Sequence, residues 1–244
     1  MSAVLDVGVA GFAVCNPQGR ARPQPAILPP NERRRAPDTV AVALEVAQAA
    51  CANAGRDPAQ LPMVFASTYG DLAITDYMCS TLAQAPTTLS PTRFHNSVHN
   101  AAAGYWSIAT GCHQPYCALG AGRYSFAIGL FAAALQVCAD QTDVLYVAYD
   151  IDAHGAQARI VDSRGLLGVA LVLTRDGGDR RLELAASEAR CAPATRAGSA
   201  NAMAVSLSLI AALERGSPDL LCLPLGPEST LQVQVRPGAS QRSH

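Results

Sequence analysis

The chain has no lysine, because all 18 of its basic side chains are arginine. Charged residues make up only 15% of the 244 residues, and the formal net charge is −1. This near-neutral balance gives no electrostatic footprint for nucleic acid or for an anionic membrane surface. We interpret the run Arg33–Arg35, which lies in a proline-rich stretch, as part of a solvated loop. A chain so poor in charge has little with which to cover its surface, so we expect a partner subunit to hide part of it.

The cysteines form neither a metal-binding pattern nor a disulfide framework. Of the eight, only Cys112 and Cys117 lie close in sequence, and no second pair or His-x-His motif accompanies them. We therefore expect buried thiols in a reducing cytoplasm, with no metal and no disulfide. The N-terminus has no basic stretch, and Asp6 interrupts its apolar run, so we predict a strand there and no signal peptide. The longest apolar segment, 124–138, is too short to predict a membrane span.

Apolar strand patterns alternate along the chain with helical patterns. Half of the residues are hydrophobic, which excludes a disordered chain and allows one sizeable core. The alternation predicts an α/β domain with a mostly parallel sheet covered by helices. We predict strands at 4–14, 62–67, 116–119, 144–149, 166–174, 181–186 and 219–223. We predict helices at 38–54, 71–84, 100–110, 124–139 and 199–215. The helix at 124–139 is apolar all round, so we expect it to be buried on every side.

The end of the chain carries two further signals. Asp176-Gly177-Gly178 is a turn pattern between two predicted strands, and it predicts a hairpin. Residues 226–244 are polar and contain proline and serine, so we interpret them as a mobile tail. The predicted organisation is therefore one domain at 1–225 followed by a tail at 226–244.

The stretch from Ser90 to Gly129 is the most informative. It reads SPTRFHNSVHNAAAGYWSIATGCHQPYCALGAGRYSFAIG. It resembles the segment of the β-ketoacyl synthases that leads to their nucleophile. That segment has an Asn-x-x-Ala-Gly helix, a turn and a strand, and then a buried helix whose start carries a cysteine. Phe65–Gly70 is similar to the Ser-Ser-x-Gly strand end of this family, and Gly168–Leu173 is similar to a later strand. The resemblance covers Val4 to Thr174 and implies a thiolase-like fold, of which this chain has a single half.

The nucleophile of that family is missing from this chain. Ungapped alignment from Asn100 places it at Arg123, and alignment back from the end of the helix places it at Ala121. We name the four residues concerned the degenerate nucleophile slot: Gly120, Ala121, Gly122 and Arg123. None is a cysteine. Cys117 lies too early, inside the predicted strand, where we expect it to point into the sheet. The two catalytic histidines of the family come from a second half that this chain lacks, so we expect no catalytic residue here.

The resemblance implies a catalytically silent subunit of the chain-length-factor type, as found in bacterial type II polyketide systems, including those that make aryl polyenes. It implies a heterodimer with a full-length ketosynthase, contact with an acyl carrier protein, and no cofactor. During decarboxylative condensation the ketosynthase would supply the cysteine and both histidines, and bulky residues of this chain would limit the acyl tunnel. The residues that we expect at the tunnel or the partner interface are Arg93, Phe94, His95, His99, Asn100, Tyr105, Trp106, Arg123 and Tyr124.

Two alternatives stay open at this stage. One is a minimal acyltransferase or thioesterase that uses Cys117 with His95 or His99. The other is a homodimeric module that binds an acyl carrier protein without catalysis.

Other chemistries find weaker support in the sequence. There is no Gly-x-Ser-x-Gly elbow for serine hydrolysis, and the Gly-x-Gly at 120–122 is by itself a weak dinucleotide motif. His95 and His99 could share a helix face, but no third metal ligand accompanies them. Asp143, Asp150 and Asp152 flank a predicted strand without a phosphate-binding loop, and we interpret them as strand-end and loop carboxylates.

Overall fold

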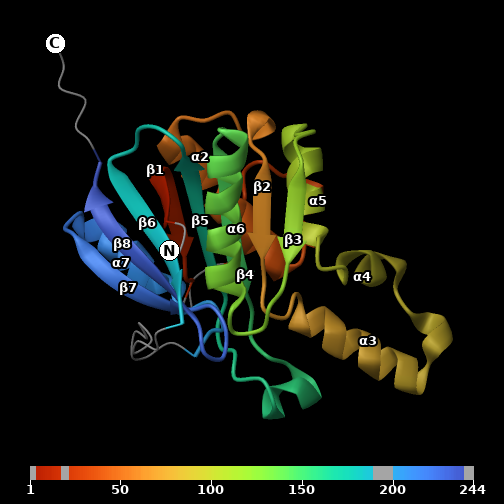
Figure 1. Cartoon of the computed structure of the whole chain (residues 1–244). Coiled ribbons are helices and arrows are strands. Elements are labelled where there is room, and N and C mark those ends of the chain that lie inside the picture. The colour runs from red at the N-terminus through yellow and green to blue at the C-terminus, as the bar shows by residue number, and fades with distance from the viewer. Residues whose placement is uncertain (1–3, 18–21, 189–199, 239–244) are drawn as a thin grey trace.

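The computed structural model of the protein describes residues 4–17, 22–188 and 200–238. An eight-stranded mixed sheet forms its centre, with the strand order β3-β2-β4-β5-β1-β6-β8-β7 (Figure 1). The strands are β1 (Val4–Cys15), β2 (Met63–Ala66), β3 (Tyr116–Leu119), β4 (Val144–Asp150), β5 (Leu167–Thr174), β6 (Arg180–Ser187), β7 (Asp219–Pro224) and β8 (Thr230–Pro237).

Only the β3-β2-β4 part of the sheet is parallel. The other five pairings are antiparallel, so the expectation of a mostly parallel sheet is wrong. The physical reason lies in the connections. α-Helices join β2 to β3 and β3 to β4, and such crossovers return the chain in the same direction. The connections from β4 to β5 and from β7 to β8 contain no α-helix, which suits antiparallel neighbours. The connection from β5 to β6 also lacks an α-helix, but these two strands are not neighbours, because each pairs antiparallel with β1, which lies between them. Because β2, β3 and β4 are parallel, their carboxyl ends lie together at the same end of the sheet.

Strand β1 separates β5 from β6. It pairs with β5 on one side and with β6 on the other, so the predicted hairpin does not form. The turn between β5 and β6 instead lies against the backbone of β1. A Cβ on Gly178 would stand 2.5 Å from the carbonyl oxygen of Val9, and Gly178 has φ +84°. Both the close approach and the positive φ require glycine at this position.

Strand β8 lies within the region that the sequence analysis assigned to a mobile tail. It pairs with β6 along its whole length and also with β7. Its side chains Leu231, Val233 and Val235 are buried. The expectation of a tail beginning at residue 226 is therefore wrong for residues 230–237. Residues 239–244 lie outside the described part of the chain.

Helices cover both faces of the sheet. The α-helices are α1 (Pro30–Arg35), α2 (Asp38–Ala54), α3 (Leu72–Gln84), α4 (Pro91–Asn96), α5 (Ala101–Thr110), α6 (Ser125–Asp140) and α7 (Ser206–Arg215). Short 3₁₀ turns are η1 (Pro58–Gln60), η2 (Pro86–Thr88) and η3 (Gly155–Arg159). Helices α2 and α5 pack on one face, and α6 and α7 pack on the other. Helices α3 and α4 project from the sheet as an arm, at the right of Figure 1.

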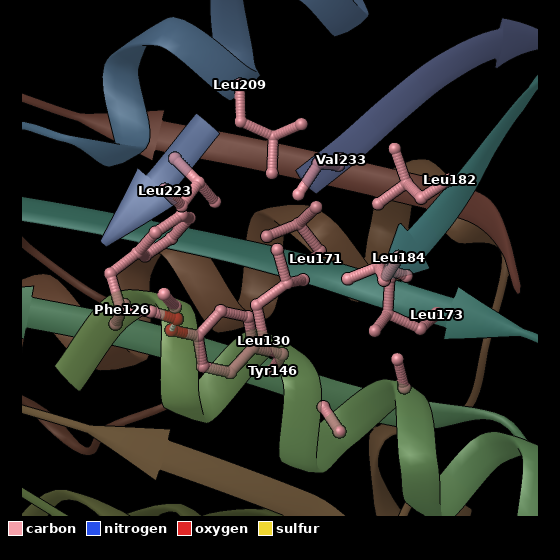
Figure 2. Close-up of a cluster of buried hydrophobic side chains, with 14 of the residues drawn as sticks. Phe126, Leu130, Tyr146, Leu171, Leu173, Leu182, Leu184, Leu209, Leu223 and Val233 are labelled. Atoms are coloured by element: carbon pink, nitrogen blue, oxygen red, sulfur yellow. Dashed lines mark hydrogen bonds between the residues drawn. The ribbon is translucent and has the colours of Figure 1, made fainter. Parts of the chain in front are cut away.

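Strand β4 shows why both faces are covered. All seven of its side chains are buried. Because side chains alternate along a strand, Val144 and Tyr146 join the core under α6, whereas Leu145 and Val147 join the core under α2. The core under α6 also takes leucines from β5, β6, β7 and α7 (Figure 2).

Tyr146 is the polar member of that core. It is fully buried, and its hydroxyl donates a 2.7 Å hydrogen bond to the carbonyl oxygen of Phe126 in α6. Burial raises the pKa of Tyr146 well above its ordinary value. The contact satisfies a hydroxyl that would otherwise be costly to bury, and it fixes the start of α6 over β4.

Helix α6 is buried on one side only. Phe126, Leu130 and Val137 face the sheet, but Leu135 is 50% exposed, so the expectation of burial on every side is wrong. No second layer covers the outer face within the described residues. The stretch Gly122–Asp140 is long and apolar enough to cross a membrane by length and composition alone, contrary to the sequence estimate. Its buried face packs on the sheet as that of a core helix does.

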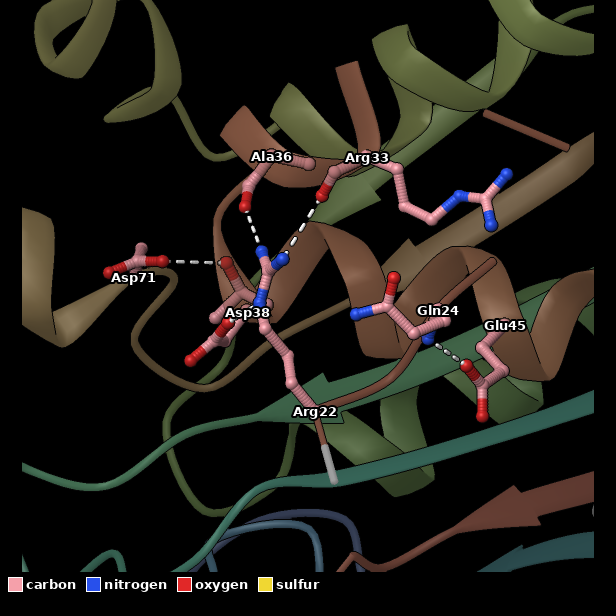
Figure 3. A network of polar contacts seen from close by, with 8 residues as sticks. Arg22, Gln24, Arg33, Ala36, Asp38, Glu45 and Asp71 are labelled. Atoms are coloured by element: carbon pink, nitrogen blue, oxygen red, sulfur yellow. Dashed lines mark hydrogen bonds and ion pairs between the residues drawn. The ribbon is translucent and has the colours of Figure 1, made fainter. Parts of the chain in front are cut away.

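The proline-rich segment before α2 is held by Arg22 (Figure 3). The Arg22 guanidinium pairs with Asp38 and donates to the carbonyl oxygens of Arg33 and Ala36. A second tie is the backbone N–H of Gln24, which donates to the carboxylate of Glu45 in α2. The arginine run therefore belongs to the short helix α1, which is fastened to the N-terminus of α2, and not to an irregular loop.

Two helical glycines, one in a crowded position and one in an open position, provide a test of how α6 packs on the sheet. A Cβ on Gly129 would lie 2.7 Å from Cε2 of Tyr146 and 3.0 Å from Cβ of Ala66, whereas a Cβ on Gly104 would meet nothing within 4 Å. We expect Gly129→Ala to lower the free energy of unfolding by about 1–3 kcal/mol through overpacking. We expect Gly104→Ala to raise it by about 0.5–1 kcal/mol. Urea denaturation measures both, and equal effects would contradict the packing of α6 on Tyr146.

Candidate functional site

The degenerate nucleophile slot joins the end of β3 to the start of α6. Its backbone is held by Ser125, which is buried at the first position of that helix. The Ser125 hydroxyl accepts a 2.8 Å hydrogen bond from the N–H of Ala121 and donates one of 2.7 Å to the carbonyl oxygen of Gly122. The turn is therefore closed by its own hydrogen bonds, and it presents no thiol at the helix tip.

His99 fills the space beside the slot. Its Nε2 lies 2.7 Å from the carbonyl oxygen of Leu119. Because a carbonyl can only accept, Nε2 carries the hydrogen and donates it. A Cβ on Gly120 would lie 3.2 Å from Cε1 of His99 and 3.0 Å from the carbonyl oxygen of Ser67. The histidine thus wedges between the ends of β2 and β3, where only a residue without a side chain fits at position 120.

A buried carboxylate organises the turn after β2. Asp150, at the end of β4, accepts a 2.8 Å hydrogen bond from the hydroxyl of Ser67. It also accepts from the N–H groups of Thr68, at 3.0 Å, and Tyr69, at 3.4 Å. The Ser67 hydroxyl in turn accepts from the N–H of Gly70 at 2.9 Å. Burial raises the pKa of Asp150, and the hydrogen bonds from Thr68 and Ser67 oppose that rise.

Ser67, His99 and Asp150 do not form a hydrolase triad. In a triad the histidine lies between the serine and the carboxylate. Here the Ser67 hydroxyl bonds directly to Asp150, and the His99 ring donates to a backbone carbonyl. Ser67 is also fully buried. The arrangement holds three strand ends together and activates no nucleophile.

Cys117 is exposed on β3, which is an edge strand, so the expectation that it points into the sheet is wrong. Its neighbour Tyr116 faces α5, because the Tyr116 hydroxyl accepts a 2.9 Å hydrogen bond from Nδ2 of Asn100. Since side chains alternate along a strand, Cys117 faces the opposite side from α5 and from His99 at its start. The geometry therefore gives no support to an acyltransferase that pairs Cys117 with His99.

The other sequence-predicted residues divide into three places. Phe94 is 56% exposed on α4, and His95, Asn100 and Tyr105 line a hollow of about 400 Å³ beside α5. Trp106 is fully buried in the core under α2 and α5.

The two arginines that we predicted at the tunnel or the partner interface each lie over an aromatic ring. Arg93 lies 4.0 Å from the ring centroid of Tyr77, within the arm. Arg123 lies 5.4 Å from that of Tyr124. A role of any predicted site residue at a partner interface stays a prediction.

Two apolar residues of this surface were not anticipated from the sequence. Val98 and Ile108 line the same hollow as Tyr105, and Ile108 is 82% exposed. We name this surface the α5 groove, and its residues are Glu32, Arg35, Thr92, His95, Val98, Asn100, Ala101, Gly104, Tyr105 and Ile108. When a helix is apolar on several sides, its sequence does not show which side packs against the core. Only the position of α5 on the sheet shows that Trp106 is buried and Ile108 is exposed.

The cysteines differ in part from expectation. Cys15, Cys51, Cys79, Cys112, Cys117 and Cys138 are free thiols. Cys222 is disulfide-bonded, so the expectation that no disulfide is present is wrong. In the described ranges, no three His, Cys, Asp or Glu side chains converge as metal ligands would.

The fold and the segment from Ser90 to Gly129 together define the class of protein to which the chain belongs. The sheet and its helices have the thiolase-like fold of the ketosynthases. The chain matches the family described as beta-ketoacyl synthase, N-terminal domain, over residues 12–223. It belongs to that family. No curated protein matches the chain.

Several solved structures are similar to the chain at low identity. A chain of the ketosynthase ApeO in complex with its chain length factor ApeC, from Xenorhabdus doucetiae, has a TM-score of 0.75 and 20% identity, with 94% of this chain and 99% of that chain covered. A chain of the ishigamide ketosynthase/chain length factor has a TM-score of 0.66 and 14% identity, with 96% and 100% covered. A chain of AntDE:AntF, a type II polyketide acyl carrier protein in complex with its ketosynthase, has a TM-score of 0.71 and 10% identity, with 95% and 99% covered.

The thiols should differ sharply in reactivity, because only the thiolate is alkylated. Burial raises the pKa of Cys51 to about 12 and that of Cys15 to about 11. Cys79 and Cys117 are exposed. We expect iodoacetamide at pH 8 to modify Cys79 and Cys117 in the folded protein and to spare Cys51 and Cys15. Peptide mass spectrometry measures this, with the urea-unfolded chain as the control in which all four react. Alkylation of Cys51 as fast as Cys117 would contradict the burial.

Proposed function

We propose that this chain is a catalytically silent subunit of the chain-length-factor type, which pairs with an active ketosynthase and helps to set the length of its product. The observation that carries the proposal is the absence of a thiol from the degenerate nucleophile slot. The strand-turn-helix segment of the family is present, yet the turn has no thiol and is closed by Ser125. The similarity to chains from two ketosynthase–chain length factor pairs supports it.

In this proposal the ketosynthase supplies the cysteine and both histidines. The pair elongates an acyl chain carried on an acyl carrier protein by decarboxylative condensation, without a cofactor, in the cytoplasm. The similarity to a chain of a type II polyketide complex that contains an acyl carrier protein supports that carrier. A type II pathway of the aryl polyene kind is the setting that we propose.

The surface assigned to the partner combines the free edge of β3 with the α5 groove. An edge strand leaves backbone N–H and C=O groups unpaired, and proteins usually cover such an edge. Next to it, Ile108 and Tyr116 are exposed and line a second hollow of about 460 Å³. This hollow shares Ile108 with the α5 groove, so the two form one apolar surface beside the edge strand.

The tunnel wall is assigned to Phe94 and Val98. Both are large, apolar and exposed, on α4 and in the turn that follows it. In the complex, an acyl chain that grows toward them would meet two bulky side chains. Each further CH₂ buried in an apolar tunnel gains about 0.8 kcal/mol. Removing a bulky side chain there would therefore favour longer products without affecting the condensation chemistry.

Co-expression with a ketosynthase encoded beside this chain tests the proposal. We expect the chain alone to self-associate, and the pair to form a 1:1 complex that buries about 2,000 Å² in total. Size-exclusion chromatography with light scattering measures both. Cys117→Ala should leave condensation by the complex unchanged. A stable monomer that binds no ketosynthase would contradict the proposal, whereas a homodimer that binds the carrier protein would favour the non-catalytic module.

Phe94 and Trp106 should respond differently to truncation. In the complex, Phe94→Ala should lengthen the products or broaden their range, because it opens the proposed tunnel. Trp106→Ala should instead lower the free energy of unfolding by about 3–5 kcal/mol, because it empties a core position. Product profiling by mass spectrometry and urea denaturation measure the two effects. Leu220→Ala, at an exposed position on β7 at the other edge of the sheet, is the matched control. Unchanged products with Phe94→Ala would contradict the tunnel assignment.

A further inference from the structure

Asp150 is the only buried acidic side chain among the residues that the structure describes, at 1% exposure. No cationic side chain in the described ranges forms an ion pair with it. A buried carboxylate without a cation is costly unless hydrogen bonds satisfy it. Those bonds come from one place, the turn 67–70 after β2. A neutral residue would avoid the cost, which suggests that this turn needs a carboxylate in particular.

The turn held by Asp150 touches the slot. The N–H of Ser67 donates to the carbonyl oxygen of Leu119 at 3.2 Å, and the same oxygen accepts from His99. On the other side of the ring, a Cβ on Gly70 would lie 3.6 Å from Nδ1 of His99. His99 is therefore enclosed between the turn and the end of β3. A shift of the turn would move the ring and, with it, the start of α5.

The same turn sets the direction of the arm. Asp71 follows it directly and caps α3, because its carboxylate accepts a 2.8 Å hydrogen bond from the N–H of Ile74. The other oxygen of Asp71 accepts from Thr39 in α2 at 2.7 Å. Helix α3 buries only Leu72 and Ile74, and Leu72 packs against Ile151 and Ala153, directly after Asp150. The segment that follows Asp150 and the turn before α3 therefore together fix where this helix leaves the sheet. The arm ends in α4, which carries Phe94.

We propose that Asp150 is a positioning residue. Its carboxylate holds the turn 67–70 against His99 and so fixes where the arm and the α5 groove stand relative to the partner. Asp150 does not touch the acyl chain; it determines how accurately Phe94 and Val98 close the tunnel. This role in product length rests on the proposed function, whereas the anchoring of the turn does not.

An amide replaces the carboxylate at this position only in part. The N–H of Thr68 lies 3.1 Å from Oδ1 and 3.0 Å from Oδ2 of Asp150, so this one donor is shared between the two oxygens. Asn has nearly the same shape, but one of its two positions is itself a donor. Asp150→Asn would therefore set an NH₂ group against a backbone N–H and release part of the turn, with almost no change in volume.

Two measurements on Asp150→Asn test the role. We expect the amides of Thr68 and Tyr69 to exchange hydrogen at least about tenfold faster, because Asp150 is their acceptor. In the complex with the ketosynthase, we expect a broader product-length distribution at an unchanged condensation rate. Ser67→Ala keeps the carboxylate and its bonds to these two amides, so it should have a smaller effect on them and on the products, whereas the amide of Gly70 loses its own acceptor and should exchange faster. It also stands in for Asp150→Asn if that variant does not fold.

Thr174→Val is the matched control. Thr174 is buried at the end of β5, at the opposite end of the sheet from Asp150, and its hydroxyl donates a 2.9 Å hydrogen bond to the carbonyl oxygen of Asp176. Its loss should lower stability without changing the exchange at 68–70 or the products. Unchanged exchange in Asp150→Asn, or faster exchange with unchanged products, would overturn the positioning role. If Phe94→Ala also leaves the products unchanged, the tunnel assignment fails as well, and the exchange result alone decides whether Asp150 anchors the turn.

Discussion

The rest of the fold depends on the double pairing of β1. This twelve-residue strand hydrogen-bonds to β5 along one side and to β6 along the other. It thereby joins the parallel part of the sheet, which carries the slot, to the antiparallel extension β6-β8-β7. Contacts between residues this far apart in sequence cost much loop entropy before they are made. Once formed, they give α6 and α7 a common surface on which to pack.

Local patterns predicted the elements well and their pairing poorly. Strand β4 and helix α2, with its glycine cap at residue 55, follow from short-range signals. The hairpin at Gly177 was wrong because a turn signal cannot show that another strand enters between its arms. Strand β8 was missed although Leu231, Val233 and Val235 alternate with polar residues. That alternation is the period-two signal of a half-buried strand, whereas the polar, proline- and serine-containing composition of the region favours a tail.

The sequence predicted where the candidate site lies along the chain, but not which of its side chains are buried and which are exposed. The family resemblance located the slot between β3 and α6, and the structure shows that turn closed by Ser125. The resemblance could not separate Phe94, on the surface, from Trp106, in the core. Asp150 was interpreted as one strand-end carboxylate among three. Its burial depends on the turn after β2, which reaches it across 82 positions of sequence.

The open edge of β3 has a consequence for how much of the protein a cell can make without aggregation. Four residues of backbone there are free to add a strand. A copy whose edge no partner covers offers it, with the exposed Ile108 and Tyr116 beside it, to other copies. Under the pairing proposed above, a cell that makes this chain in excess of its ketosynthase would then accumulate aggregates of this chain. Matched synthesis, for instance from adjacent reading frames translated together, would keep the edge covered from the time that the chain folds.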